Sequence, residues 1–243
     1  MLINKNMKNL LDIKKALRKY KKSGQAKILQ RFFKTGPGEY GEGDIFLGLK
    51  VQEIRDVSKK YQESSFSDLK KLLSSKVHEE RSVAIMILNY QFQEADTKKR
   101  GEIYNFYLKN LSGINNWDLV DSSAHKIIGE YLRVSKTSRK ILYKLSKSKN
   151  LWERRISIIS TFQFIKNGEF KETLKIAKIL LKDKEDLIHK ATGWMLREVG
   201  KRNLLIEEEF LKKHYKTMPR TMLRYAIERI PEKRRQAYLK GKI

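Results

Sequence analysis

Apolar residues along this chain recur with the spacing of helices rather than of strands. They fall three or four positions apart over most of its length, which places them on one face of an α-helix. The chain contains three prolines and lacks the evenly spaced turn signals of β proteins. The pattern therefore predicts an all-α fold, and the expected helices are 6–22, 25–33, 51–62, 66–73, 79–93, 98–111, 116–132, 138–147, 151–166, 170–181, 185–201, 207–214 and 220–230.

The expected helices also recur in pairs. From Tyr90 onward a two-helix unit returns at intervals of about 35 to 45 residues without a tight sequence repeat, as in degenerate HEAT-like arrays. Each unit of such an array packs only on its neighbours, and the stack curves into a superhelix with one concave face. We expect residues 1–243 to form a single HEAT-like-repeat domain, a curved α-α superhelical solenoid whose concave face suits a duplex.

Two connections between helices carry local signals. Ser65 and Asp68 have the spacing of a capping box at the start of a helix. The sequence TGPGEYGEG at 35–43 holds four glycines and a proline, which predicts a tight turn. It lacks the spacings GxxxxGK[ST] and GxGxxG, so a nucleotide-binding loop is not expected. Contact of this turn with the edge of a DNA duplex is a less favoured alternative.

The charge of the chain indicates a polyanionic partner. Its 243 residues hold 54 Lys and Arg against 28 Asp and Glu, a net charge of +26. The excess is spread along the chain: residues 136–155 hold eight basic side chains and a single acid, and residues 197–242 are also basic. A distributed charge predicts a long binding face for DNA or RNA, with strongly salt-dependent affinity.

Several classes of site are excluded or not expected. The absence of cysteine excludes disulfides, thiolate zinc sites and iron–sulfur clusters. The four histidines are far apart in sequence with no i, i+4 pair, so we expect no metal and no cofactor. The longest apolar run, 83–88, is too short to span a bilayer, and residues 1–23 lack the apolar core of a signal peptide. We expect a cytoplasmic protein, nucleoid-associated if its source is prokaryotic.

The helix expected at 185–201 carries a tryptophan away from its apolar side. Its apolar stripe consists of Ile188, Ala191, Thr192, Met195, Leu196 and Val199. Trp194 lies about 130° from this stripe, among Lys190, Arg197 and Lys201. An aromatic ring surrounded by cations is typical of a nucleic-acid surface. The alternative is a tryptophan that caps a neighbouring helix while the cations are merely solvated.

Candidate chemistry is concentrated in NNWDLVDSSAH at 115–125. On an α-helix Trp117, Asp121 and His125 are one and two turns apart on one face. Asp121 lies at the edge of the apolar stripe formed by Val120 and Ala124, which continues to residues 127 and 128. A carboxylate there is either half of a structural ion pair or a group placed to act on a developing charge.

The next basic segment supplies a cation that needs a partner. Arg155 falls near the centre of the stripe formed by residues 151, 152, 156, 159 and 162, so it is expected to point into the packing. Asp121 is its partner in a structural interpretation, and a DNA phosphate is its partner in a functional one. The neighbouring Arg154 points elsewhere and is at most a phosphate contact.

Five segments together resemble one family. In chain order they are YGEGDIFLG, NNWDLVD, LWERRISIIS, HKATGWMLREVGK and MPRTMLRYAIERIP. Their order and spacing, over nearly the whole chain, are similar to those of the AlkD family of HEAT-like-repeat DNA glycosylases. The resemblance implies a hydrolase that removes cationic alkylated purines, such as 3-methyladenine and 7-methylguanine, from double-stranded DNA. It further implies that the protein grips the backbone and leaves the base unflipped. No lysine nucleophile is evident at the site, so we expect a monofunctional glycosylase without strand cleavage.

Roles for individual residues follow from the same resemblance. It implies that Asp121 is the catalytic aspartate, that Trp117 and Trp194 flank the backbone at the lesion, and that Arg155 meets a phosphate. Lys50, in FLGLK, stands where the best-known branch has a glutamine, and a phosphate contact is its alternative role. With Lys50, the cations Arg154, Lys190, Arg197 and Lys201 are the expected DNA contacts, and the protein is expected to act as a monomer.

Two other classes of function remain open on the sequence. The first is a HEAT-repeat module that binds DNA or RNA without chemistry, since the AlkD-like family includes branches without excision activity. The second is a helical scaffold for acidic protein partners, attracted by the same positive charge. The matches at Asp121 and both tryptophans favour the enzyme over these alternatives.

Overall fold

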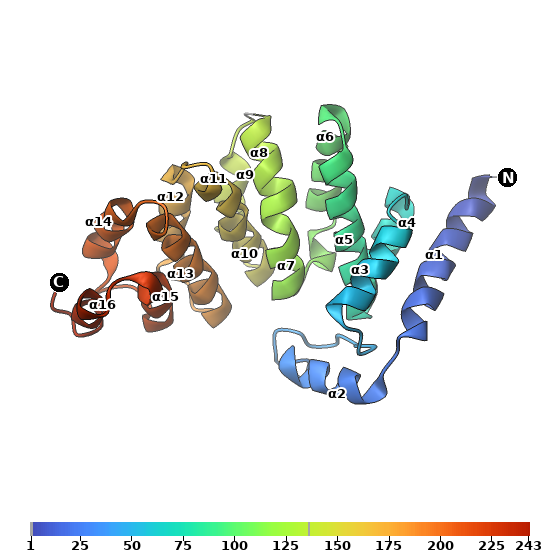
Figure 1. The fold of residues 1–243 in the computed structure, drawn as a ribbon, viewed down its shortest axis with the longest axis horizontal. Helices are drawn as coiled ribbons and strands as arrows, with labels where there is room; N and C mark the ends of the chain where they lie inside the picture. Colours follow the sequence, from blue (N-terminus) through green and yellow to red (C-terminus); the bar gives the residue numbers. More distant parts are fainter. Residues whose placement is uncertain (1, 136) are drawn as a thin grey trace. The chain divides into compact units, whose positions relative to one another are not determined.

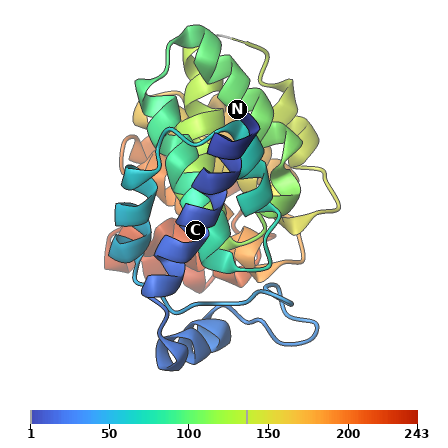
Figure 2. The ribbon, with the colours of Figure 1, turned by 90° about the vertical axis from the view of Figure 1, so that its right-hand side faces the viewer.

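A computed structural model describes residues 2–135 and 137–243, and these are mostly helical (Figures 1 and 2). The all-α prediction is confirmed: in the part of the chain that the structure describes, extended backbone pairs only at an isolated bridge between Ile45 and Val77. The helices are α1 (Leu2–Lys19), α2 (Ser23–Phe32), α3 (Val51–Lys60), α4 (Phe66–Leu73), α5 (His78–Glu94), α6 (Thr97–Lys109), α7 (Trp117–Ala124), α8 (Glu130–Val134), α9 (Lys140–Leu145), α10 (Leu151–Ser160), α11 (Phe162–Lys166), α12 (Lys171–Leu180), α13 (Asp186–Gly200), α14 (Leu204–His214), α15 (Arg220–Ala226) and α16 (Glu232–Leu239).

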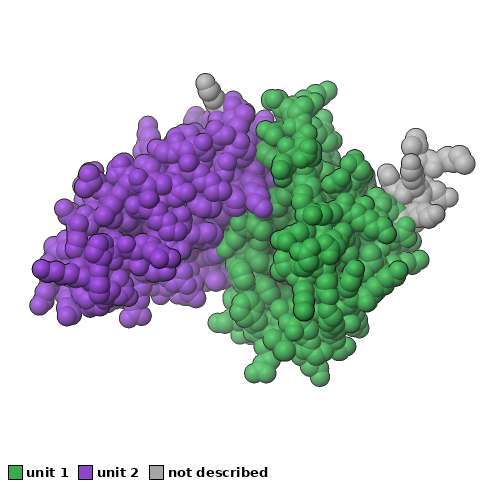
Figure 3. Space-filling model, in the orientation of Figure 1, with its two compact units in different colours: residues 1–123 green, residues 124–243 purple. Residues whose placement is uncertain are grey.

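The chain divides into two compact units, residues 1–123 and residues 124–243 (Figure 3). Each unit has its own buried apolar core, and consecutive helices pack against one another within it, as expected for a helical-repeat protein. The prediction that residues 1–243 form a single domain stays a prediction.

In the first unit, α5 is the central helix. It packs on α1, α3, α4 and α6, and it is buried around most of its circumference. Its buried charges have partners. Glu80 forms an ion pair with Lys14 of α1 at 2.8 Å, and this pair connects α5 with α1. The helix α2 and the loop after it lie beyond the ends of the other helices of this unit in both views (Figures 1 and 2).

In the second unit, α13 is the central helix and packs on α10, α12, α14 and α15. All six residues of its predicted stripe are buried. Gly193 allows α15 to approach closely, because a Cβ at this position would overlap the carbonyl oxygen of Met222. The stripe therefore has the structural role that the sequence predicted for it.

Two of the features predicted between helices are present in the structure, and one helix was not predicted. The Ser65 cap is confirmed, since its hydroxyl accepts the backbone N–H of Asp68 at 3.2 Å. The turn at 35–43 is also confirmed, with Gly38 and Gly43 at positive φ. The helix α16 was not predicted, since the expected helices end at residue 230; Pro231 stands at its N-cap. No described helix is long and apolar enough to cross a membrane.

Two expected helices are interrupted. The helix predicted at 116–132 changes at His125 into a π-helix, His125–Gly129, before α8 begins. The helix predicted at 151–166 is broken at Thr161, which separates α10 from α11. In the π-helix Gly129 lies against α10, where a Cβ would overlap the carbonyl oxygen of Ser160. This close approach explains why a glycine stands at the position.

Candidate functional site

In the first unit, Trp117 packs against a cluster of rings made by Phe33, Phe46 and His78, which we call the ring cluster. Its indole lies nearly parallel to Phe33, with ring centroids 5.1 Å apart and an interplanar angle of 13°. Phe33 lies 5.0 Å from both Phe46 and the imidazole of His78, and Phe46 lies 4.6 Å from the same imidazole. Offset ring contacts of this kind are stabilising beyond their buried area. The ring cluster supports the indole of Trp117 at the first residue of α7.

Two further contacts complete the surroundings of Trp117. The edge of Phe32 meets the indole at 5.9 Å and 74°, and the indole Nε1 donates a hydrogen bond to the Tyr40 hydroxyl at 3.3 Å. Trp117 is half-buried, whereas Phe32 is 61% exposed. These contacts come from α2 and the glycine-rich turn, so both elements support Trp117.

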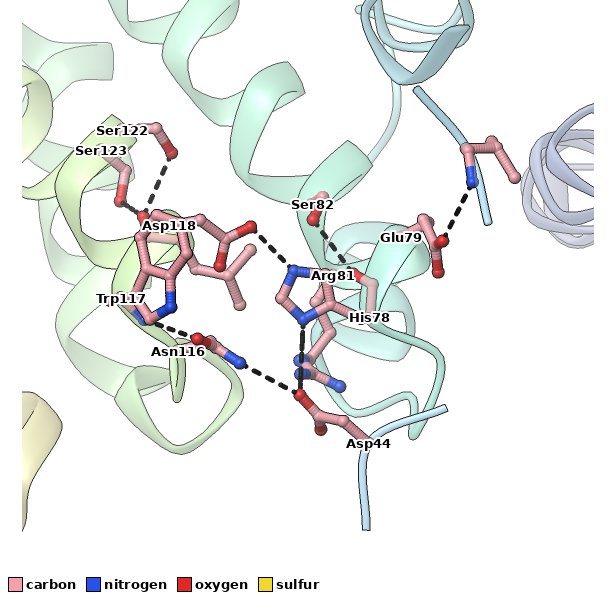
Figure 4. Close-up of polar contacts among 12 residues, drawn as sticks. Asp44, His78, Glu79, Arg81, Ser82, Asn116, Trp117, Asp118, Ser122 and Ser123 are labelled. Atoms are coloured by element: carbon pink, nitrogen blue, oxygen red, sulfur yellow. Dashed lines mark hydrogen bonds and ion pairs between the residues drawn. The ribbon is translucent and has the colours of Figure 1, made fainter. Parts of the chain in front are cut away.

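The same end of α7 carries a buried polar cluster (Figure 4). His78 Nε2 lies 2.8 Å from an Asp118 carboxylate oxygen, and His78 Nδ1 lies 3.4 Å from Asp44. Arg81 donates to the same Asp44 oxygen at 2.6 Å. Asn116 reaches this oxygen with its side-chain N–H at 3.5 Å, and its side-chain oxygen accepts the backbone N–H of Trp117 at 2.8 Å. The cluster connects α5, α7 and the segment around Asp44.

Two members of this cluster, Asp44 and His78, are stabilised in their ionised forms by their neighbours. Burial would raise the pKa of Asp44, but the His78 hydrogen bond and the Arg81 guanidinium outweigh it and lower that pKa. Burial would lower the pKa of His78, but the hydrogen bond and charge of Asp118, helped by Asp44, raise it above the ordinary 6.5 even though Arg81 opposes them. The imidazolium is therefore stabilised in the folded protein.

Asp121 lies one turn after Trp117 on α7 and is half-buried. Val120 and Ala124, the core residues predicted to flank it, are fully buried. Its charge acts on a neighbour: burial raises the pKa of the Tyr107 hydroxyl, a hydrogen bond with Ser123 opposes this, and Asp121 adds to the rise. The structure thus places Asp121 at the edge of the apolar face, as predicted.

His125 does not continue the face of Trp117 and Asp121 on an uninterrupted α-helix, because the π-helix begins there. It belongs to the second unit, where its ring meets Phe162 edge-on at 5.4 Å. Burial, with the charges of Lys166 and Lys126, lowers the pKa of His125 to about 4. His125 is therefore neutral near pH 7.

The two arginines of α10 behave differently. Arg155 is 5% exposed and donates to the carbonyl oxygen of Leu187, so the prediction that it points into the packing is confirmed. Arg154 binds Asp183 through Nε at 2.6 Å and donates to the carbonyl oxygens of Ser148 and Lys149. Because this guanidinium is bound within its own unit, the structure gives no support to Arg154 as a phosphate contact.

Trp194 is half-buried rather than fully exposed. It lies off the buried stripe of α13, as predicted, but its ring is tilted against Phe162 at a centroid distance of 5.9 Å. The ammonium of Lys166 lies 4.6 Å from the Phe162 ring, and the Arg202 guanidinium lies 5.9 Å from it. Trp194 is therefore part of a surface cluster of aromatic rings and cations.

The other predicted contacts on α13 are engaged in ion pairs. Lys190 pairs with Asp186 at 2.8 Å, Lys201 pairs with Glu198 at 2.6 Å, and Arg197 pairs with Glu228. The two lysine side chains are 42% and 40% exposed. Asp186 is 57% exposed, and an exposed pair of this kind contributes about 0–1 kcal/mol. The Glu198 carboxylate is only 8% exposed and also binds Arg202 at 3.1 Å, so Lys201 is held by a buried acid.

Residues 136–155 separate into bound arginines and exposed lysines. Arg139 binds Glu169 at 2.6 Å and Glu172 at 2.9 Å. Lys140, Lys144, Lys147 and Lys149 are exposed. Lys136 lies outside the described residues. The positive surface of this segment is thus made by lysines.

Lys50 is exposed at the N-cap of α3, and the segment before it is fixed by a buried acid. The Glu79 carboxylate accepts the backbone N–H groups of Leu47, Gly48 and Leu49 at 2.9 to 3.3 Å. Gly48 has a φ of +90°, and a Cβ there would overlap the carbonyl oxygen of Lys22. This support could not be predicted from the sequence, because a lone glutamate in a helical pattern gives no sign of it.

Trp194→Ala is expected to cost less stability than truncating a core tryptophan, because Trp194 is half-buried and contacts Phe162 at the surface. We expect a loss of at most about 2 kcal/mol in the free energy of unfolding, against about 3 to 5 kcal/mol for a buried tryptophan. Trp152→Ala is the matched control, since Trp152 lies in the same unit and is 8% exposed. Denaturant unfolding of both variants measures the difference, and equal losses would show that Trp194 is a core residue.

Within the described residues, no group of three or more His, Asp or Glu side chains is arranged to hold a metal ion. The chemistry that this arrangement can supply comes instead from the Asp121 carboxylate, from aromatic rings whose orientation is fixed, and from exposed lysines.

Comparisons with known proteins bear on the family and the fold of the chain. The profile of the family described as DNA alkylation repair enzyme matches residues 13–230. A solved structure from Enterococcus faecalis, described as a predicted DNA alkylation repair enzyme, is 19% identical, with a TM-score of 0.68, over 87% of this chain and 97% of that chain. AlkD2 from Streptococcus mutans is 21% identical, with a TM-score of 0.53, over 75% of this chain and 91% of that chain. No curated relative matches the chain. At these identities the two structures show a shared fold.

Proposed function

The chain belongs to the family of DNA alkylation repair enzymes, and from that premise we propose that it hydrolyses the N-glycosidic bond of cationic alkylated purines in duplex DNA. Membership in the family makes DNA the partner. The proposal of N-glycosidic bond hydrolysis rests on the arrangement on α7. There the half-buried carboxylate of Asp121 follows Trp117, which is stacked on Phe33, by one turn. Such an arrangement joins a rigid aromatic surface to a group that can stabilise positive charge.

The chemistry needs a single carboxylate. Alkylation of a ring nitrogen makes the purine cationic and a good leaving group, so no acid has to protonate it. As the bond lengthens, the sugar gains oxocarbenium character, and Asp121 stabilises this charge or orients the attacking water. A charge pair at about 4 Å and an effective dielectric near 20 gives roughly 4 kcal/mol, or about a thousandfold in rate if it forms only in the transition state.

The other residues of the proposal hold DNA rather than react. Trp117 and Trp194 contact the deoxyribose backbone on either side of the lesion, and the exposed lysines meet phosphates. Arg155 is included as a phosphate contact, through the 5% of its surface that is exposed. We further propose that the protein acts in the cytoplasm as a monomer and needs no metal or cofactor. It leaves the damaged base unflipped, and it leaves the abasic site without cutting the strand.

The direct test is base release. The protein is incubated with a duplex treated to carry methylated purines, and the released bases and alkali-labile sites are quantified together. Methylpurines and abasic sites should appear in equal amounts, and strand breaks should form only after alkali. Tight DNA binding without release of any base would instead indicate a non-catalytic binding module.

A further inference from the structure

The ring cluster and the polar cluster of the first unit meet at His78. Its imidazole packs on both Phe46 and Phe33. It also lies between two carboxylates, those of Asp118 on α7 and of Asp44 (Figure 4). Asp118 directly follows Trp117 in the chain. His78 is therefore linked to Trp117 in two ways. Its ring packs on Phe33, which stacks on the indole, and its Nε2 is hydrogen-bonded to Asp118, the residue after Trp117.

We propose that His78 is a positioning residue, which ties the first turn of α7 to the Asp44 segment and so sets the orientation of Trp117. This inference rests on the proposed function, in which Trp117 holds the sugar backbone against Asp121. His78 itself is 2% exposed, so it acts through its neighbours and does not touch DNA.

The groups that face His78 make its protonation state matter. Asp118 and Asp44 are the acids around it, Arg81 lies 3.3 Å from Nδ1, and Phe33 and Phe46 cover the ring. When both nitrogens are protonated, Nε2 donates to Asp118 and Nδ1 donates to Asp44. The neutral ring keeps a single N–H, so one carboxylate loses its donor, and Nδ1 can then accept from Arg81 instead.

The direction of the pH effect follows from the raised pKa of His78. The charged imidazole stabilises the arrangement fully below the ordinary histidine pKa of 6.5, and this stabilisation is lost as pH rises through the higher pKa of the folded protein. Hydrogen bonding around Trp117 should change over the same range, whereas the surroundings of Trp152 and Trp194 should not.

The test uses the full-length protein labelled with 5-fluorotryptophan, which gives three fluorine resonances. Trp117→Phe assigns the Trp117 signal. In the wild type this signal should move with pH, with a midpoint above 6.5. In His78→Phe, which keeps an aromatic ring on Phe46 but loses both hydrogen bonds, the movement should disappear. A Trp117 signal that ignores pH in the wild type, or that titrates unchanged in His78→Phe, would overturn the proposal.

A second variant covers the case in which His78→Phe does not fold. Asp118→Asn removes the charge that raises the His78 pKa, so the midpoint of the Trp117 titration should fall below that of the wild type. An unchanged midpoint would also overturn the proposal.

The rate of base excision gives a second test, independent of the fluorine titration. His78→Phe should slow single-turnover base release by about tenfold, because a sugar held by a misplaced Trp117 meets Asp121 poorly, while duplex affinity stays within about twofold. If the wild-type protein releases no base, the proposed function fails and the fluorine titration still tests His78. If the titration fails while excision proceeds, the positioning role alone is wrong.

Discussion

Asp121→Asn is expected to slow the excision of a cationic methylpurine by about two orders of magnitude or more. The carboxylate is the group proposed to face the developing oxocarbenium ion, and its amide replacement carries no charge. Affinity for the duplex should stay the same or rise, because the variant removes a negative charge close to phosphates. Single-turnover rates and equilibrium binding on one defined duplex measure the two effects separately.

A matched control separates this effect from a change in net charge. Asp56→Asn removes the same charge from an exposed position on α3 of the same unit, and excision should stay within about twofold. Unchanged excision by Asp121→Asn would remove Asp121 from the mechanism.

The second large effect is expected in the salt dependence of DNA binding. If the exposed lysines of residues 136–155 and of α13 neutralise six to ten phosphates, affinity should fall by about 10³-fold or more between 50 and 200 mM salt. Fluorescence anisotropy of an undamaged duplex across this range gives the slope. A nearly flat slope would contradict a long basic binding face.

Single substitutions test which cations contribute to the slope. Lys144→Gln removes an exposed charge and should reduce the log–log slope by about 0.9. Arg139→Gln is the control in the same segment, since its guanidinium is bound to Glu169 and Glu172, and it should leave the slope unchanged. Thermal unfolding shows whether either variant stays folded.

The helices could be predicted from the sequence because their apolar faces repeat with a helical period. The stripe of α13 is an example: its six predicted residues are all buried, and Trp194 lies off it. The interruptions could not be predicted. The π-helix at His125 and the break at Thr161 arise where helices approach within the fold, as at Gly129 beside Ser160, and the apolar pattern itself runs on without a break.

Residues of the candidate site could be predicted only where their spacing along one helix places them on a particular face. Trp117, Asp121 and Arg155 stand out by their places on helical faces. Their supports do not, because Phe33 packs on Trp117 from a distant part of the chain and is itself packed on Phe46 and His78. The partner of Arg154 could not be predicted for the same reason: Asp183 lies far away in sequence, and no periodicity joins the two residues.

The most direct test of the central claim compares two lesions in one sequence context. A duplex carrying a single 7-methylguanine and the same duplex carrying hypoxanthine, an uncharged damaged purine, are each incubated with excess protein under single-turnover conditions. We expect release of the cationic base, with an abasic site left in an intact strand, and little or no release of the neutral base. Equal release of both bases, or binding of both duplexes with no release from either, would contradict the central claim.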